Sequence, residues 1–186
     1  INIVEDVLIK FNKEIVEALN ELACKAKRIT SKENNIITVV QENKDLGFVG
    51  TPTEINKEFL TETIKANEVP VVAPLGLNKN NQTFNINADT AAGSIAIELK
   101  ARRLMIISDV EGVLDSEKKL IPEINSKKAN ELIDQEVISG GMIPKIKNCL
   151  NVTSNGVKAV VIIDGRKNHS LLFELLSDKG SGTLIR

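Results

Sequence analysis

The stretch Val157-Lys158-Ala159-Val160-Val161-Ile162-Ile163 is the strongest strand signal in the sequence. Its run of consecutive β-branched residues is typical of a strand that is covered on both faces, as in a parallel sheet. Residues 103–108 and 69–75 form two similar apolar runs, and helical patterns lie between the runs. This alternation predicts the α/β class, specifically a three-layer αβα sandwich with a mainly parallel central sheet.

Helix and turn signals complete this outline. In the first segment, apolar residues recur every three or four positions, which predicts an amphipathic helix over residues 4–22 with that face buried. We expect a turn over residues 47–53, helices that begin at Asp89 and Pro144, and a last strand over residues 183–185. The apolar face of the first helix consists of Val4, Leu8, Phe11, Ile15, Leu19 and Leu22.

The composition excludes several classes of protein. The 24 basic and 25 acidic residues leave a net charge of −1, so we expect no binding to the phosphate backbone of nucleic acids. The chain has no Tyr or Trp, so we expect no aromatic platform on which single-stranded nucleic acid could stack. It also has no apolar run long enough to span a membrane. A single His excludes a histidine-based metal cluster within the chain. Cys24 and Cys149 lack CxxC spacing, which favours a reduced, cytoplasmic protein and leaves a disulfide between them open.

Ligands of parallel α/β sheets bind beyond the carboxyl ends of the strands, so the polar residues near those ends are the candidates for a site. The first candidate stretch is Asn85-Ile86-Asn87-Ala88-Asp89. Asn85 and Asp89 are four residues apart, so a helical turn would place them on one side. From the residues alone, a role of Asp89 as the helix N-cap is the favoured alternative.

Two further stretches combine glycine with charge. In Ser108-Asp109-Val110-Glu111-Gly112-Val113-Leu114, a strand end followed by a glycine turn suits a nucleotide, although a simple Asx turn has the same pattern. In Ser139-Gly140-Gly141-Met142-Ile143-Pro144-Lys145, the glycines permit a close approach of the backbone to an anion. Lys145 lies in the first turn of the next helix, where the helix dipole disfavours a cation unless an anion is near. A solvated lysine is the equally weighted alternative.

Together and in this order, the three stretches resemble signatures of the amino acid kinase family, and within it those of the branch that phosphorylates N-acetyl-L-glutamate. Residues 47–50, 71–76, 162–166 and 182–183 support the resemblance, which extends from residue 4 to residue 186. It implies transfer of the γ-phosphoryl group of ATP to the side-chain carboxylate of N-acetyl-L-glutamate, a step of arginine biosynthesis in the cytoplasm. It also implies Mg²⁺ that is held mainly by the phosphates, no protein metal site, and a homodimer or higher homo-oligomer.

The resemblance assigns roles to individual residues. Lys145 would stabilise the charge on the transferred phosphoryl group, Asp89 would organise the catalytic lysines, and Asn85 would bind the acetylglutamate. The residues that it assigns to the ATP site are Asp109, Val110, Glu111, Gly112, Val113, Leu114, Val137, Ile138, Ser139, Gly141 and Met142.

The resemblance also implies a domain organisation. Residues 1–186 would be the C-terminal two-thirds of an amino acid kinase domain, with residues 1–75 in the substrate and dimerisation lobe and residues 76–186 in the ATP-binding lobe. The family's leading Lys-Tyr-Gly-Gly strand, its Gly-Gly-Gly loop and a substrate-binding arginine would lie before residue 1. Residues 26–35 lack the glycines that the family has there. Two alternatives stay open: another amino acid kinase, of the glutamate 5-kinase or UMP kinase type, and a non-catalytic module that binds ATP or regulates.

Overall fold

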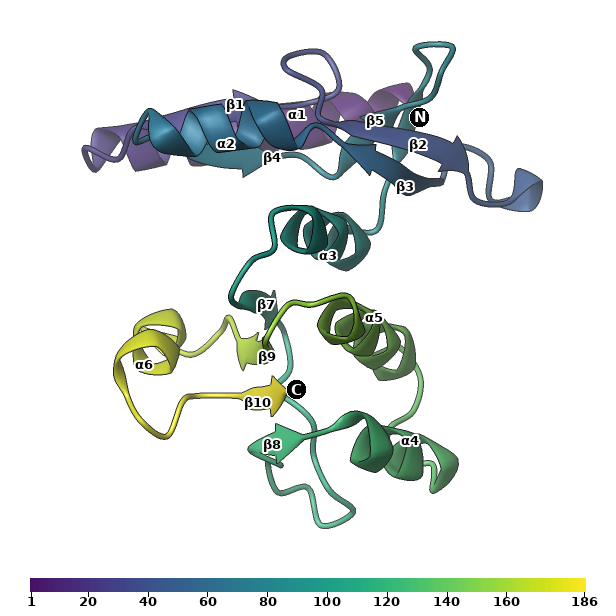
Figure 1. The fold of residues 1–186 in the computed structure, drawn as a ribbon, viewed down its shortest axis with the longest axis vertical. Coiled ribbons are helices and arrows are strands. Elements are labelled where there is room, and N and C mark those ends of the chain that lie inside the picture. The colour runs from purple at the N-terminus through teal and green to yellow at the C-terminus, as the bar shows by residue number, and fades with distance from the viewer. The chain divides into compact units, whose positions relative to one another are not determined.

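The computed structural model describes all 186 residues and confirms the α/β class (Figure 1). The chain divides into two compact units, residues 1–99 and 100–186, which are described separately below. The predicted functional division after residue 75 does not coincide with this boundary and stays a prediction. No helix has the combination of length and apolar character that a bilayer-spanning segment needs.

The first unit contains three helices, a short 3₁₀-helix and six strands. Strands β1 and β4 form a parallel pair, and the other four strands form a sheet in the order β3-β2-β5-β6. In that sheet β2 and β5 are parallel, whereas β2–β3 and β5–β6 are antiparallel. The elements are α1 (Asn2–Glu21), β1 (Ala26–Ile29), β2 (Ile37–Gln41), η1 (Lys44–Leu46), β3 (Gly50–Ile55), α2 (Lys57–Lys65), β4 (Val69–Val72), β5 (Leu75–Leu77), β6 (Thr83–Asn85) and α3 (Ala88–Glu98).

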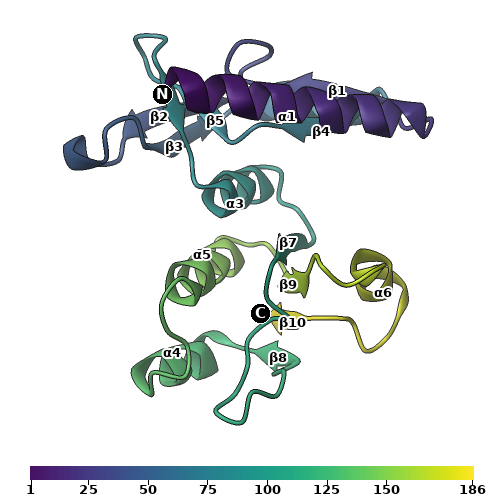
Figure 2. The ribbon, with the colours of Figure 1, turned by 180° about the vertical axis from the view of Figure 1, so that it is seen from behind.

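The helices of the first unit cover its strands. Figures 1 and 2, which show opposite sides, place α2 in front of the β1–β4 pair and α1 behind it. Helix α3 packs against β3, which its small buried residues Ala91, Gly93 and Ala96 permit because they let the backbones approach. The core of this unit consists of Ile29, Ile36, Ile37, Val39, Leu60, Phe84, Ile86 and Ala91.

Helix α1 forms as predicted, but part of the predicted buried face is wrong. Phe11 is 58% exposed and Leu22 is 80% exposed. The fully buried positions are Glu5, Asn12 and Val16. Two of these are polar and have partners: Asn12 Nδ2 donates to the Val71 carbonyl at 2.8 Å, and Glu5 accepts hydroxyl hydrogen bonds. Because hydrogen bonding makes burial of a polar group acceptable, the apolar pattern misplaced the buried face.

Three loop predictions change in the structure. The turn expected over residues 47–53 gives way at Gly50 to strand β3, which pairs with β2. The apolar run 69–75 is not one strand, because β4 ends at Val72 and β5 begins at Leu75, beyond Pro74. The glycine-poor segment 26–35 is ordered by other means: Asn34 adopts a positive φ of 58°, and Thr30 Oγ1 accepts the Glu33 N–H at 3.0 Å.

The second unit is a single sheet between two helical layers. Its strand order is β7-β9-β10-β8, with β7–β9 and β8–β10 parallel and β9–β10 antiparallel. Helices α4 and α5 lie on one side of the sheet and α6 lies on the other (Figures 1 and 2). The elements are β7 (Leu104–Ser108), β8 (Glu123–Ile124), α4 (Ser126–Asp134), α5 (Met142–Ser154), β9 (Val160–Asp164), α6 (Ser170–Leu176) and β10 (Thr183–Ile185).

The apolar stretch 157–163 supplies the centre of this unit. Every residue of β9 is buried, as predicted for a strand covered on both faces. Ile146, Cys149 and Val152 of α5 are completely buried as well. The helix expected to start at Pro144 begins two residues earlier, at Met142. Pro144 is tolerated there because the first four N–H groups of a helix have no intrahelical acceptor.

The hydroxyl of Thr183 joins two segments of the second unit. It accepts the Val113 N–H at 2.8 Å and donates to the Ile121 carbonyl at 2.7 Å. Thr183 and Val113 are buried and Ile121 is partly buried, so removal of the hydroxyl would leave two backbone groups without their partner, one of them away from water.

We therefore expect Thr183→Val to lower the free energy of unfolding by about 2 kcal/mol, because a buried N–H and a partly buried carbonyl lose their hydrogen-bond partner. Urea unfolding followed by circular dichroism measures this change. Thr53→Val is the matched control, since Thr53 is exposed and donates a single hydrogen bond, to the Thr38 carbonyl. Equal stability changes in the two variants would contradict the role of Thr183.

Candidate functional site

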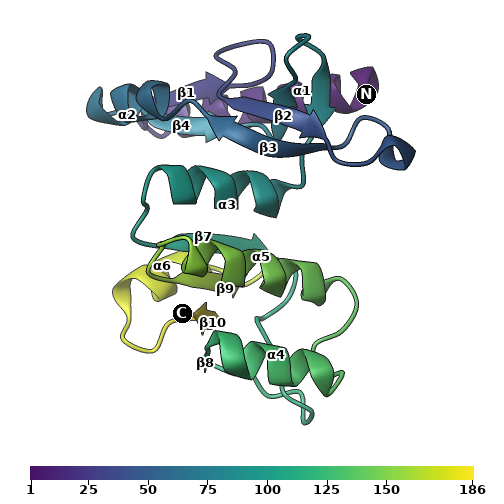
Figure 3. The same ribbon diagram turned by 45° about the vertical axis from the view of Figure 1, so that its right-hand side comes forward.

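The carboxyl ends of β7 and β9 define one edge of the second unit. The two strands run parallel with Ser108 opposite Asp164, so the chain leaves both strands at the same edge (Figure 3). The Gly165 N–H donates to the Ser108 carbonyl at 2.8 Å, which ties the two exits together. The edge thus has the position at which open α/β sheets bind their ligands.

Charged side chains of both signs gather at this edge. Arg166 donates from Nε to Asp164 Oδ1 at 2.9 Å and from Nη2 to Asp164 Oδ2 at 3.0 Å, a bidentate pair with a nearly buried carboxylate. These bonds, together with the Arg166 N–H, lower the pKa of Asp164 to about 2. The pKa of Arg166 is raised, mainly by Asp164 and further by the negative charges of Asp109 and Glu111. Lys167 Nζ lies 3.1 Å from Glu111 Oε1 and forms an ion pair with it.

Of the residues assigned to the ATP site, those at 109–114 follow β7 directly. Gly112 has φ of 140°, and a Cβ at this position would lie 2.5 Å from Thr183 Oγ1, so this turn requires glycine. Val113 is 1% exposed, and its N–H is bonded to Thr183. The exposed part of this loop therefore lies before Val113, at Asp109 to Glu111.

The second group of assigned residues joins α4 to α5. The N–H groups of Val137 and Ile138 both donate to the Leu132 carbonyl, and Ile138 is buried. Gly140 adopts the positive φ that the paired glycines were expected to permit. The Met142 N–H donates to the Ser139 carbonyl, and the helix starts immediately after Gly141.

Lys145 is the fourth residue of α5 and is half-buried. It thus lies in the first turn, as predicted. The partial positive charge of the helix N-terminus opposes a cation at this position. The local electrostatics therefore favour a nearby anion.

In the first unit the structure corrects two expectations about Asn85 and Asp89. Asn85 is the last residue of β6, not part of a helical turn with Asp89, and its N–H donates to the Phe48 carbonyl at 2.9 Å. The N-cap of α3 is Asn87, whose Oδ1 accepts the N–H groups of Asp89 and Thr90. The capping interpretation of Asp89 is thus wrong, because a neighbouring amide already performs that role. The half-buried carboxylate of Asp89 lies in the first turn, where the helix dipole favours it.

Sequence reasoning assigned no role to Arg166 and Lys167, the two cations after β9. The signal that could have found them is an aspartate that ends a buried strand and is followed by Gly-Arg-Lys. No group of three or more His, Cys, Asp or Glu side chains is arranged to hold a metal ion.

The chain belongs to the amino acid kinase family, whose model matches residues 2–164. Over all 186 residues it is 94% identical to the acetylglutamate kinase of Pelagibacter ubique strain HTCC1062, and it spans 65% of that protein's length. It is 45% identical to the acetylglutamate kinase of Bradyrhizobium sp. strain ORS 278, and this match covers all of this chain and 67% of the relative. The resemblance to this family, inferred from the three motifs, is confirmed.

Solved structures agree on the fold. Smu.665 from Streptococcus mutans UA159 matches with a TM-score of 0.79 and 33% identity over 93% of this chain and 65% of that one. N-acetylglutamate synthase from Neisseria gonorrhoeae, complexed with coenzyme A and L-arginine, matches with a TM-score of 0.78 over 87% of this chain and 38% of that one. At 23% identity the latter match shows the shared fold alone.

The Asp164–Arg166 pair predicts a specific pH dependence. The folded-state pKa of Asp164, about 2, lies below its ordinary value of 3.8, so the unfolded state binds more protons between these values. The pair therefore stabilises the fold above about pH 4, and this stabilisation is lost as the pH falls toward 2. A carboxyl NMR titration should give a midpoint near 2 for Asp164, and Arg166→Gln should raise it. A midpoint that stays the same in Arg166→Gln would contradict this cause.

Proposed function

We propose that the protein carrying this chain transfers the γ-phosphoryl group of ATP to the side-chain carboxylate of N-acetyl-L-glutamate. The observation that carries the proposal is the 94% identity with an acetylglutamate kinase along the whole chain. The reaction forms the acyl phosphate of acetylglutamate and ADP, a step of arginine biosynthesis. Because the chain spans 65% of that relative's length, the proposal concerns the complete protein.

Phosphoryl transfer depends on positioning and on stabilisation of the charge on the equatorial oxygens, with little covalent help from the protein. We assign the stabilising cation to Lys145, whose place in the first turn of α5 already favours a nearby anion. Asp89 is assigned to organising the catalytic lysines, on the resemblance of residues 85–92 to the family's motif. Asn85 is assigned to binding the acetylglutamate.

The nucleotide is assigned to the segments predicted from the sequence. The position of residues 109–114 beyond the carboxyl end of β7 supports this assignment. Mg²⁺ prefers oxygen ligands and few protein carboxylates when it accompanies a nucleotide, so we assign it mainly to the phosphate oxygens of ATP. Bound in this way, it would neutralise part of the charge of the transferred group.

Two broader properties belong to the same proposal. We assign the protein to the cytoplasm, which agrees with two cysteines that form no disulfide. We assign it a homodimeric or higher homo-oligomeric state. Several exposed apolar side chains of α1, among them Val7 and Phe11, agree with an interface on that helix.

The activity is tested with the full coding sequence that contains these 186 residues. With Mg²⁺, ATP and N-acetyl-L-glutamate, we expect equal amounts of ADP and of an acyl phosphate that hydroxylamine traps as the hydroxamate. Glutamate and UMP serve as competing acceptors and should yield no phosphorylated product. ATP binding without transfer to any acceptor would contradict the proposal and favour the non-catalytic module.

In the complete enzyme, Lys145→Ala should lower kcat by about 10²–10³-fold, because it removes a contact that is strongest in the transition state. The KM for ATP should change far less. Lys147→Ala is the matched control, since this lysine is exposed on the same helix. If the kcat of Lys145→Ala stays within threefold of that of the control, the change in activation free energy is on the order of 0.6 kcal/mol or less, and Lys145 has no part in the mechanism.

A further inference from the structure

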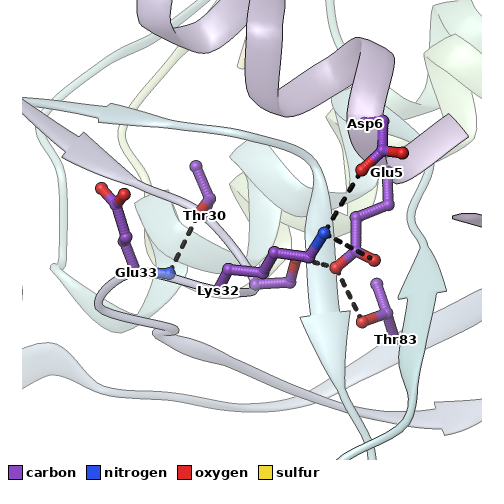
Figure 4. A network of polar contacts seen from close by, with 7 residues as sticks. Glu5, Asp6, Thr30, Lys32, Glu33 and Thr83 are labelled. Atoms are coloured by element: carbon purple, nitrogen blue, oxygen red, sulfur yellow. Dashed lines mark hydrogen bonds and ion pairs between the residues drawn. The ribbon is translucent and has the colours of Figure 1, made fainter.

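Glu5 is a buried carboxylate that has no part in the mechanism above. It lies in the first turn of α1 and is 7% exposed. Its Oε1 accepts the Ser31 hydroxyl at 2.6 Å and the Thr83 hydroxyl at 2.9 Å. Figure 4 shows the three segments that meet at this oxygen: the start of α1, the loop after β1 and the start of β6.

A lysine completes the cluster. Lys32 Nζ lies 3.7 Å from Glu5 Oε2 and donates to Asp6 Oδ1 at 3.3 Å. The two carboxylates raise the pKa of Lys32, and the hydrogen bond that Lys32 donates to Asp6 is the largest cause. Lys32 therefore supplies the opposite charge that a buried carboxylate requires, and both Ser31 and Lys32 belong to the loop that lacks the family's glycines.

Strand β6 is the element whose position depends most on this cluster. It has three residues and lies at the end of the sheet order β3-β2-β5-β6, where it pairs with β5 and has one isolated parallel bridge on its other side, between Asn85 and Val49. A short edge strand with few ladder hydrogen bonds is weakly fixed by the sheet itself. The bond from Thr83 to Glu5 adds a directional tether from outside the sheet.

The tethered residue and the proposed substrate ligand share one face of the strand. Side chains alternate along a strand, so Thr83 and Asn85 point to the same side, whereas Phe84 points into the core and is 3% exposed. A shift of β6 that breaks the Thr83 bond therefore displaces the side chain of Asn85 in the same direction.

We propose that Glu5, acting through the hydroxyl of Thr83, is a positioning residue for Asn85. This inference rests on the proposed role of Asn85 in binding acetylglutamate. Asn85 donates and accepts hydrogen bonds whose strength depends steeply on distance and angle, so a small displacement weakens substrate binding. Neither Glu5 nor Thr83 touches the substrate in this account.

The test compares Thr83→Val with Ser31→Ala in the complete protein. Each variant removes one hydroxyl from the same Glu5 oxygen, and valine keeps the branched shape of threonine, but only Thr83→Val frees β6. We expect Thr83→Val to raise the KM for acetylglutamate about fivefold, with kcat and the KM for ATP within about twofold of wild type. Ser31→Ala should leave all three constants within about twofold.

Amide hydrogen exchange gives a second readout that does not depend on activity. The Asn85 amide, bonded to the Phe48 carbonyl, should exchange faster in Thr83→Val and at the wild-type rate in Ser31→Ala. Equal effects of the two variants on KM and on exchange, or an unchanged Asn85 amide in Thr83→Val, would overturn the positioning role. If wild-type protein fails to phosphorylate acetylglutamate, the proposed function fails, and the exchange rates alone decide whether Glu5 positions β6.

Discussion

The parallel pairing of β7 with β9 is the constraint on which the second unit depends. Strand β9 is buried along its whole length, and its register with β7 places Ser108 opposite Asp164. Both strands must therefore end at one edge, where the Gly165 N–H closes on the Ser108 carbonyl. The loop that starts at Asp109 and the turn that contains Arg166 are neighbours for this reason, although more than fifty positions separate them in the sequence.

The edge that results carries charges of both signs. Arg166 is bound to Asp164, and Lys167 is paired with Glu111, so the cations after β9 already have carboxylate partners. Such an edge would repel a bare triphosphate less than an acidic surface and attract it less than a basic one. In the proposed function, Mg²⁺ would neutralise part of the charge of the nucleotide, and Lys145 would be a separate cation for the transferred group.

Local patterns predicted much of the fold, because short-range periodicity decides most elements. The alternation of apolar runs and helical segments was enough for the α/β class, and strand β10 lies where the pattern predicted. Strand β1 had no such signal, since Lys27 and Arg28 occupy its centre and its formation depends on pairing with β4. The buried side of α1 was misjudged for a similar reason: the partners of Glu5 and Asn12 lie far away in the sequence.

The candidate site shows the same limit. The motifs pointed to Asn85, Asp89 and Lys145 as candidates, but whether Asn87 or Asp89 caps α3 depended on a two-residue difference in where the helix starts. Arg166, the partner of Asp164, follows it by two residues. The placement of Arg166 beside Asp109 nevertheless depends on the pairing of β7 with β9, which no local pattern predicts. Periodicity indicates where helices and strands form, and it does not indicate which distant polar groups meet in the core.

Hydrogen exchange of the complete protein, with and without a non-hydrolysable ATP analogue and Mg²⁺, tests the central claim that the edge after β7 and β9 binds the nucleotide. We expect slower exchange in the peptides that contain Asp109 to Glu111 and Gly165 to Lys167. We expect no change in α6 (Ser170–Leu176), which serves as an internal reference in the same unit. If the protein binds the analogue and the exchange rates in both loops do not change, the nucleotide does not bind at this edge.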